Sequence, residues 1–337
     1  MSNLARKLLR GLRPRSRLRR GLHRIKAAWQ ARALILTYHR VVPAVTHDPF
    51  EIQVTAQRFA QHLDYLRRTY RVVGVGDLVE QLRSQALRHR RQVVLTFDDG
   101  YEDNYRHAAP LLQQYGLPAA FYLTAGYVGG ARPFWWDELD RLVMSHPGNF
   151  LEVDAPVQRT YALADAAGRR GAVHDLSARL RRLPAEQREA LLDRLSGGRR
   201  LQAAVMDQPM TWDQARGLAR QGFTIGAHSC RHPALGGLTE AQARQEVEGS
   251  KAILEGELQA EVAHFSYPHD DGDYHARCPA GVSRTAVARA GFASAVSVIP
   301  GANAVGQDLF ALRRVTVRNW DRDEFARQVA DAFRYDH

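Results

Sequence analysis

Short apolar runs alternate with amphipathic stretches along most of the chain. Apolar runs of this length, bounded by polar residues, are typical of buried strands, and apolar residues recurring every three or four positions are typical of helices. The runs predict strands at 33–38, 72–75, 93–97, 119–123, 224–227, 263–267 and 293–298. The amphipathic stretches predict helices at 55–69, 77–87, 103–115, 211–221, 239–259 and 283–290. Parallel strands joined by helical crossovers produce such alternation, so an α/β fold with a parallel sheet is expected.

The alternation stops between residues 131 and 210. This segment holds an aromatic cluster at 134–136, a pair of short strands between 150 and 162 around Pro156, and a charged helical stretch at 175–195. We interpret residues 131–210 as an insertion within one domain that spans residues 33–337.

Acidic side chains and histidines follow two of the predicted strands. Asp98 and Asp99 come directly after the strand at 93–97, and His228 and His232 follow the strand at 224–227. Functional sites of alternating parallel folds lie at the carboxyl ends of the strands, so these groups are expected at one rim. An Asp at such a junction also serves as a helix N-cap. Two adjacent carboxylates, however, repel each other unless a cation or proton separates them.

The two histidines are spaced as ligands of one metal ion. A separation of four residues places both imidazoles on one face of a helical turn, as zinc requires. One carboxylate and two imidazoles leave coordination positions open for water and a substrate oxygen, which is typical of catalytic zinc. The sequence therefore predicts one divalent metal ion, with zinc as the expected metal.

The charge of the chain is concentrated at its N-terminus. The chain has 337 residues and a net charge of +11, from 47 basic and 36 acidic residues. Residues 1–32 hold eleven Arg or Lys and no Asp or Glu, so the remaining chain is balanced. Leucines interleaved with these basic residues favour a peripheral helix on an anionic membrane, and a solvated tail is the alternative. The neutral body argues against nucleic-acid binding through the arm.

Targeting signals and cysteines bear on the compartment. The arm lacks the apolar stretch of a secretory signal, and no later segment approaches the roughly 20 apolar residues of a membrane helix. Two cysteines, Cys230 and Cys278, do not make a disulfide framework. We therefore expect a cytoplasmic protein, peripheral at the inner face of the membrane where the arm binds lipid.

Two motifs carry a resemblance to a known family. The segments 96–100 (Thr-Phe-Asp-Asp-Gly) and 228–233 (His-Ser-Cys-Arg-His-Pro) resemble the first two motifs of the polysaccharide deacetylases, the NodB-homology group or carbohydrate esterase family four. Segments 36–41, 134–137 and 211–212 also resemble members of that family, and the likeness spans roughly residues 33–318. The resemblance implies a distorted (β/α)7 barrel, with the insertion between the two metal motifs. It also implies a metal-dependent hydrolase that removes an N-acetyl group from an amino sugar.

The resemblance assigns roles to the residues of both motifs. Asp99, His228 and His232 would bind the metal, and Asp98 would be the general base that activates water. The third motif departs from the family pattern of Arg-x-Pro-x-Gly, in which Arg orients the base. Here Ser266 replaces that Arg within the segment 266–270 (Ser-Tyr-Pro-His-Asp). Tyr267, Pro268 and His269 are assigned to the substrate side, with the amide of His269 as a candidate oxyanion donor.

The general acid of the family has no counterpart in this sequence. The late Leu-x-His of the family, whose His is usually the acid, is replaced by Leu312-Arg313-Arg314. His39, at the end of the first predicted strand, is our first candidate because an imidazole titrates near neutral pH. His269 is the second candidate. A purely structural histidine at the rim is the alternative for His39.

Trp135 and Trp136 allow two interpretations. With Phe134, they form either a platform on which a sugar stacks or an apolar seal between insertion and barrel.

Together the motifs, the resemblance and the basic arm predict a deacetylase acting on a glycan, a lipid-linked glycan or a smaller N-acetylated glycoconjugate. A catalytically impaired barrel that binds glycan, and a nucleic-acid-binding protein that uses the arm, are the alternatives.

Overall fold

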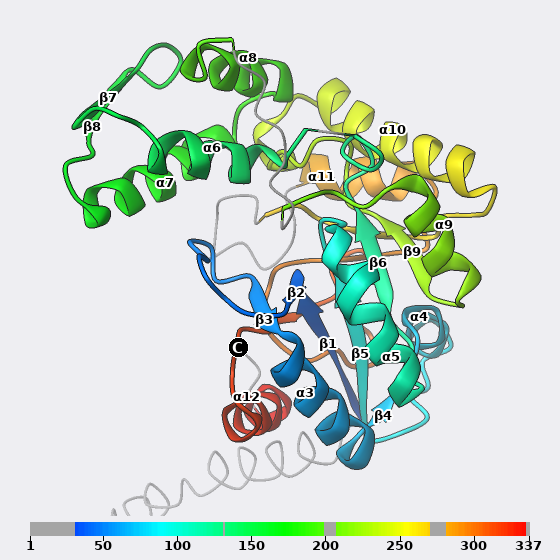
Figure 1. Cartoon of the computed structure of the whole chain (residues 1–337). Coiled ribbons are helices and arrows are strands. Elements are labelled where there is room, and N and C mark those ends of the chain that lie inside the picture. The colour runs from blue at the N-terminus through cyan, green and yellow to red at the C-terminus, as the bar shows by residue number, and fades with distance from the viewer. Residues whose placement is uncertain (1–30, 131, 199–206, 270–280, 335–337) are drawn as a thin grey trace, which may run out of the picture.

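The computed structural model describes residues 31–130, 132–198, 207–269 and 281–334 (Figure 1). The predictions for the basic arm concern residues 1–30, which lie outside the described residues. Arg32, the last residue assigned to the arm, is the first residue of strand β1. Among the described helices, none combines the length and the apolar character needed to cross a bilayer.

A curled parallel sheet forms the centre of the molecule. Its strands follow the order β11-β10-β9-β6-β5-β1-β12, and β4 pairs with β5 outside this path. The strands are β1 (Arg32–Tyr38), β4 (Arg71–Val72), β5 (Arg91–Phe97), β6 (Ala120–Leu123), β9 (Thr224–Ala227), β10 (His264–Ser266), β11 (Ser294–Val296) and β12 (Val315–Thr316). Val296 in β11 also bridges to Leu312, just before β12, so the two edges of the sheet approach each other. The predicted distorted (β/α)7 barrel is confirmed.

Helices cover the outer face of this sheet. They are α3 (Ala56–Thr69), α5 (Ala109–Tyr115), α9 (Trp212–Arg220), α10 (Glu240–Leu258), α11 (Gly281–Arg289) and α12 (Arg322–Arg334). Helix α4 (Val75–Arg83) packs instead against the opposite face of the sheet, in one apolar cluster with Ile35, Val94 and Tyr122. A π-helical turn, Asn104–Ala108, leads into α5. The side chains of Thr55, Thr211 and Thr239 cap α3, α9 and α10 by accepting a backbone N–H, which satisfies one of the donors that a helix start leaves unpaired. The sequence did not predict α12 or the two-residue strand β12.

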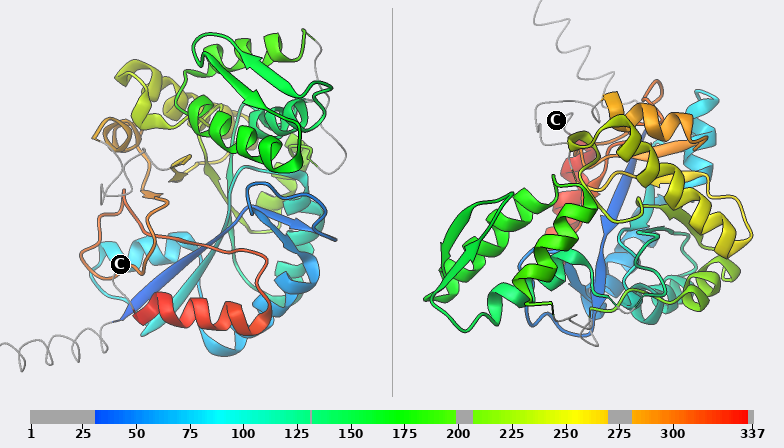
Figure 2. Two further views of the ribbon diagram at one scale, coloured as in Figure 1. Left: turned by 90° about the vertical axis from the view of Figure 1, so that its left-hand side faces the viewer. Right: turned by 90° about the horizontal axis from the view of Figure 1, so that it is seen from above.

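The insertion stands over the carboxyl ends of the strands (Figures 1 and 2). It contains α6 (Trp135–Met144), the antiparallel pair β7 (Phe150–Val153) and β8 (Arg159–Ala162), α7 (Ala166–Leu180) and α8 (Ala185–Leu195). The single helical stretch predicted at 175–195 is therefore wrong: two helices meet there, and Pro184 directly precedes α8 because proline fits a helix start but not its interior. A second apolar core joins α6, α7 and α8 to Tyr101 and Tyr127 of the barrel.

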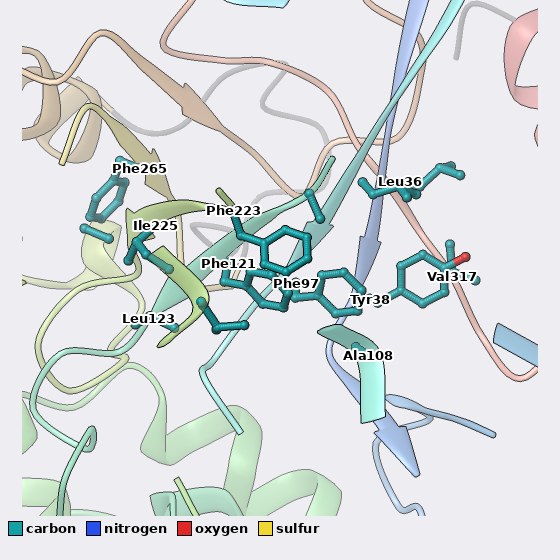
Figure 3. Close-up of a cluster of buried hydrophobic side chains, with 14 of the residues drawn as sticks. Leu36, Tyr38, Phe97, Ala108, Phe121, Leu123, Phe223, Ile225, Phe265 and Val317 are labelled. Atoms are coloured by element: carbon teal, nitrogen blue, oxygen red, sulfur yellow. The ribbon is translucent and has the colours of Figure 1, made fainter. Parts of the chain in front are cut away.

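Stacked aromatic rings between the sheet and the outer helices hold the strand ends that precede the polar rim (Figure 3). Phe97 stacks on Phe121, with ring centroids 4.8 Å apart, and on Tyr38, with centroids 5.4 Å apart. Phe223 meets the ring of Phe121 edge-on at 5.4 Å. Tyr38 and Phe97 are the last residues of β1 and β5, so this packing fixes the positions from which His39 and Asp98 begin.

We expect Phe121→Ala to lower the free energy of unfolding by about 3–5 kcal/mol, because it leaves a cavity in a fully buried stack. Phe150→Ala is the matched control: Phe150 is 65% exposed, and its loss should change the stability by less than about 0.5 kcal/mol. Urea unfolding of both variants measures the difference. Equal effects would contradict this account of the core.

Candidate active site

Four strand ends place polar side chains around one cavity of about 240 Å³. β1 is followed by His39, β5 by Asp98 and Asp99, β9 by His228, and β10 by Tyr267. The insertion contributes a wall through Ser177 and Arg181, and the segment after β2 (Arg40–Val42) contributes Phe50 and Ile52 just before β3 (Gln53–Thr55). The cavity thus lies between barrel and insertion, at the rim that the sequence predicted.

Asp99, His228 and His232 point their ligand atoms at one another. Oδ1 of Asp99 lies 3.5 Å from Nε2 of His228 and 3.4 Å from Nε2 of His232, and the two Nε2 atoms are 3.1 Å apart. Nδ1 of His228 lies 2.8 Å from the carbonyl oxygen of Ser266. Because a carbonyl oxygen only accepts, this Nδ1 carries the proton and Nε2 presents its lone pair to the cluster. The structure therefore brings the three predicted ligands together, all of them buried.

The protonation of the cluster also suits a cation. Burial lowers the pKa of His232 to about 4, so its imidazole is neutral at neutral pH. Burial by itself would raise the pKa of Asp99, but the two close imidazoles outweigh it and hold that pKa well below the usual range. One carboxylate oxygen and two ring nitrogens within 4.8 Å of one another are a donor set that fits a divalent metal.

The backbone adopts left-handed conformations at this cluster. Asp99 has φ 74°, Ser229 has φ 62° and His232 has φ 59°. Such conformations are costly outside glycine and persist where the surroundings enforce them. Here the hydroxyl of Ser229 accepts the backbone N–H of His232 at 2.9 Å, and Gly100, with φ 93°, completes the turn after Asp99. These turns aim the ligand side chains into the cavity.

Asp98 is held through one oxygen and free at the other. Its Oδ2 accepts a hydrogen bond from Ser266 Oγ at 3.0 Å and from Arg314 Nη1 at 2.7 Å. Its Oδ1 is buried and has no hydrogen-bond partner. Burial raises the pKa of Asp98, and Arg314, His228 and His39 together lower it further than burial raises it. Asp98 is therefore an ionised carboxylate with one oxygen available to accept a proton.

Arg314 is the functional residue that our sequence analysis missed. It lies just before β12, is 4% exposed, and donates from Nε to the carbonyl oxygen of Ser297 at 2.7 Å. The guanidinium that the family pattern places at position 266 thus comes here from a different segment. The signal was present in Leu312-Arg313-Arg314, where an arginine stands in the place of the expected histidine.

Both candidates for the general acid lie at the cavity. His39 is partly exposed, lines the cavity and lies near both carboxylates, and its Nδ1 has no hydrogen-bond partner. His269 packs its ring against His232, with centroids 4.4 Å apart. Burial lowers the pKa of His269 well below its usual range, so it holds no proton to donate at neutral pH. His269 is therefore the weaker candidate for the general acid.

The residues predicted to contact substrate fall into two groups. Trp136, Tyr267 and His269 line the cavity. Trp135 does not, and its assignment as a sugar-stacking residue is wrong. It is 1% exposed, its Nε1 donates to the carbonyl oxygen of His232 at 3.4 Å, and Arg188 covers its ring. Pro268 is likewise buried outside the cavity lining, so its part is to shape the turn that leads to His269.

Cys230 faces away from the cluster although it stands between the two histidines in sequence. Its Sγ lies 3.9 Å from the carbonyl oxygen of Gln245 and packs against Gly249 on α10. Cys230 is therefore not part of the donor set.

The rim of the parallel barrel thus carries an Asp-His-His cluster beside a second buried carboxylate, a combination that suits hydrolytic chemistry. The family model described as "Polysaccharide deacetylase" matches residues 86–147 and 195–289, on either side of the middle of the insertion. The resemblance indicated by the motifs is confirmed by this match.

Individual relatives agree with this match. "Putative polysaccharide deacetylase YxkH" of Bacillus subtilis is 21% identical over 294 residues, which cover 87% of this chain and 74% of that protein. The fold is similar to that of the Streptococcus pyogenes deacetylase PplD, solved with acetate, with a TM-score of 0.57, 16% identity, and 89% and 99% of the two chains covered. IcaB from Ammonifex degensii gives a TM-score of 0.56 at 20% identity, with 90% and 97% covered.

We expect Arg314→Gln to lower turnover by about 10²-fold. Asp98 then loses the guanidinium that fixes the orientation of its carboxylate and favours the ionised form. The pKa of Asp98 should rise, which moves the acid limb of the kcat/KM profile to higher pH. Arg314→Lys keeps the charge without the planar geometry of the guanidinium, so its turnover should lie between that of the unchanged chain and that of Arg314→Gln. Circular dichroism checks that each variant is folded. An unchanged acid limb would show that Arg314 does not act on Asp98.

We expect His232→Ala to weaken zinc binding by about 100-fold or more, because two donors remain of three. Titration of chelator-treated protein with zinc measures the affinity. Cys230→Ser is the control, since its sulfur points away from the cluster, and it should bind zinc like the unchanged chain. Equal affinity in both variants would rule out His232 as a ligand.

Proposed function

We propose that this protein is a metal-dependent deacetylase that hydrolyses the N-acetyl group of an amino sugar within a glycan or lipid-linked glycan. The strongest support is the position of Asp98: an ionised carboxylate with a free Oδ1, adjacent in sequence to the Asp99–His228–His232 cluster. The match to the polysaccharide deacetylase family model gives the reaction class, and the cavity between barrel and insertion gives access to a sugar.

Asp99, His228 and His232 would hold the metal, with zinc as the proposed ion. A zinc ion held there would supply Lewis-acid chemistry: it would polarise the acetyl carbonyl and lower the pKa of a water molecule. The hydrogen bond from Nδ1 of His228 to the carbonyl oxygen of Ser266 fixes the tautomer needed for ligation. The buried carboxylate of Asp99 would offset part of the positive charge of that ion.

Asp98 acts as the general base in this proposal. Its Oδ1 accepts a proton from the water that attacks the acetyl carbon, while Ser266 and Arg314 hold Oδ2 in place. The backbone N–H of His269 is the proposed donor to the carbonyl oxygen as negative charge develops there. A C–O bond forms and the C–N bond breaks, which releases acetate and the free amine.

His39 is the proposed general acid that protonates the leaving nitrogen. It stands at the end of β1 beside both carboxylates and presents an Nδ1 without a partner. The glycan-binding barrel without catalysis is disfavoured, because Arg314 supplies the guanidinium that the altered third motif lacks.

Acetate release from a panel of N-acetylated glycans by zinc-loaded protein tests the proposed function. The unchanged chain should release acetate, and Asp98→Asn should lose activity by about 10²-fold or more while still binding zinc. If Asp98→Asn loses the metal instead, the roles of Asp98 and Asp99 are reversed. Absence of acetate release from every glycan would contradict the proposal.

We expect His39→Ala to lower acetamide hydrolysis by about 10²–10⁴-fold with zinc binding intact. The loss should be much smaller for an aryl acetate, whose leaving group departs without a proton. His269→Ala serves as the comparison, because it tests the second candidate with the same two substrates. A leaving-group-dependent loss in His269→Ala alone would reassign the acid.

A further inference from the structure

Exposed arginines gather at the end of the barrel opposite the cavity. They come from the end of α3, from β4, from the start of β5 and the segment before it, and from the end of α12. These elements lie away from the insertion in Figure 1. We call this set the basic end: Arg67, Arg68, Arg71, Arg88, Arg90, Arg91 and Arg334. Three acidic residues lie among them: Asp64 and Asp331, which pair with members of the set, and Asp77. The basic end therefore keeps a net positive charge.

Tyr70 shows that four of these arginines form one surface. Arg67 and Arg71 line a hollow of about 440 Å³ with Tyr70 and Tyr115. Tyr70 stacks on Phe333 at 5.3 Å, and the guanidinium of Arg91 lies 5.7 Å from the centre of the Phe333 ring. Arg334 follows Phe333 directly. Burial raises the pKa of Tyr70, and Arg91 and Arg334 act against this rise, so both lie near Tyr70. Arg67 and Arg71 thus line the hollow, and Arg91 and Arg334 lie beside its Tyr70 and Phe333 rings.

The basic arm of the sequence joins the folded domain at this same place. The backbone N–H of Arg32 donates to the carbonyl oxygen of Arg90 at 2.9 Å, and Arg32 is in register with Arg91. Residues 1–31 carry ten Arg or Lys and no acidic residue, interleaved with leucines and Trp29. The positive charge of the arm is therefore continuous in sequence with that of the basic end.

We propose that the basic end is a docking surface for an anionic phospholipid bilayer, on which the chain lies with its cavity facing away from the lipid. Arginines near such a surface are attracted to its phosphate groups. The leucines and Trp29 of the arm suit the boundary between headgroups and acyl chains, which a nucleic acid does not offer. The bilayer therefore fits this combination of residues better than a nucleic acid does.

The length of the strands sets the distance of the cavity from the lipid. β5 runs from Arg91 at the basic end to Phe97 beside Asp98, and seven residues of strand span about 20 Å. The reacting sugar would then meet the enzyme on the aqueous side, at least about 20 Å above the bilayer. This statement about substrate rests on the proposed function, whereas the docking itself does not.

Vesicle binding of the full chain tests the docking. The probe is phosphatidylcholine vesicles with about one third phosphatidylglycerol, compared with pure phosphatidylcholine. The variant Arg67→Ser/Arg71→Ser/Arg91→Ser/Arg334→Ser should bind the anionic vesicles about 10-fold or more weakly. The matched control, Arg170→Ser/Arg179→Ser/Arg182→Ser/Arg194→Ser, removes the same charge from exposed positions of the insertion and should change binding less than about 2-fold.

A fluorescent label reports the orientation independently of those variants. In a chain with Cys230 and Cys278 replaced by Ser, a label on Ala86→Cys, between α4 and β5, should be quenched by lipid-borne quenchers. A label on Ala178→Cys, on α7 of the insertion, should not. The proposal would be overturned by equal losses of vesicle binding in the two arginine variants, by the absence of a preference for anionic lipid, or by quenching only at position 178. Tighter binding of duplex DNA than of anionic vesicles, with the same dependence on the four arginines, would also overturn it.

Discussion

The burial of two neighbouring carboxylates is the constraint on which the rest of this site depends. Asp98 and Asp99 are both nearly inaccessible, and two adjacent negative charges in such a place need compensation. The structure compensates the two carboxylates with different groups. Arg314 reaches Asp98 across 216 residues of sequence, and two imidazoles face Asp99 where a cation would sit. Because the compensation differs, one carboxylate is suited to accepting a proton and the other to ligation.

The parts of this architecture that follow from local sequence were predictable. The alternation of apolar runs and amphipathic stretches predicted the parallel sheet, because buried parallel strands are apolar on both faces. The closure of that sheet into a distorted barrel was implied by the family resemblance of the two motifs. Asp98, Asp99, His39, His228 and His232 were predicted at one rim, since each follows a strand and parallel strands end at the same side. The conformation of the chain between these strands did not need to be known for that inference.

Features that arise only from tertiary contacts were not predictable. The pairing of Arg314 with Asp98 depends on β12, whose two residues are too short to show a hydrophobic period. Trp135 and Trp136 look alike in sequence, yet Arg188 and the backbone of His232 enclose the first, while the second faces the cavity. Which of two neighbouring indoles is covered depends on how α8 packs against α6, and the local pattern carries no information on it.

The insertion packs on an apolar core that it shares with Tyr101 and Tyr127 of the barrel, and it forms part of the cavity wall through Ser177 and Arg181. The ligand cluster and Asp98 come from the barrel, so this part of the wall and the reacting groups belong to different segments of the chain. Substitutions in α7 that alter the wall leave the stack of Tyr38, Phe97 and Phe121 untouched. A change at position 177 or 181 can therefore reshape the cavity while Asp98 and the ligand cluster keep their positions.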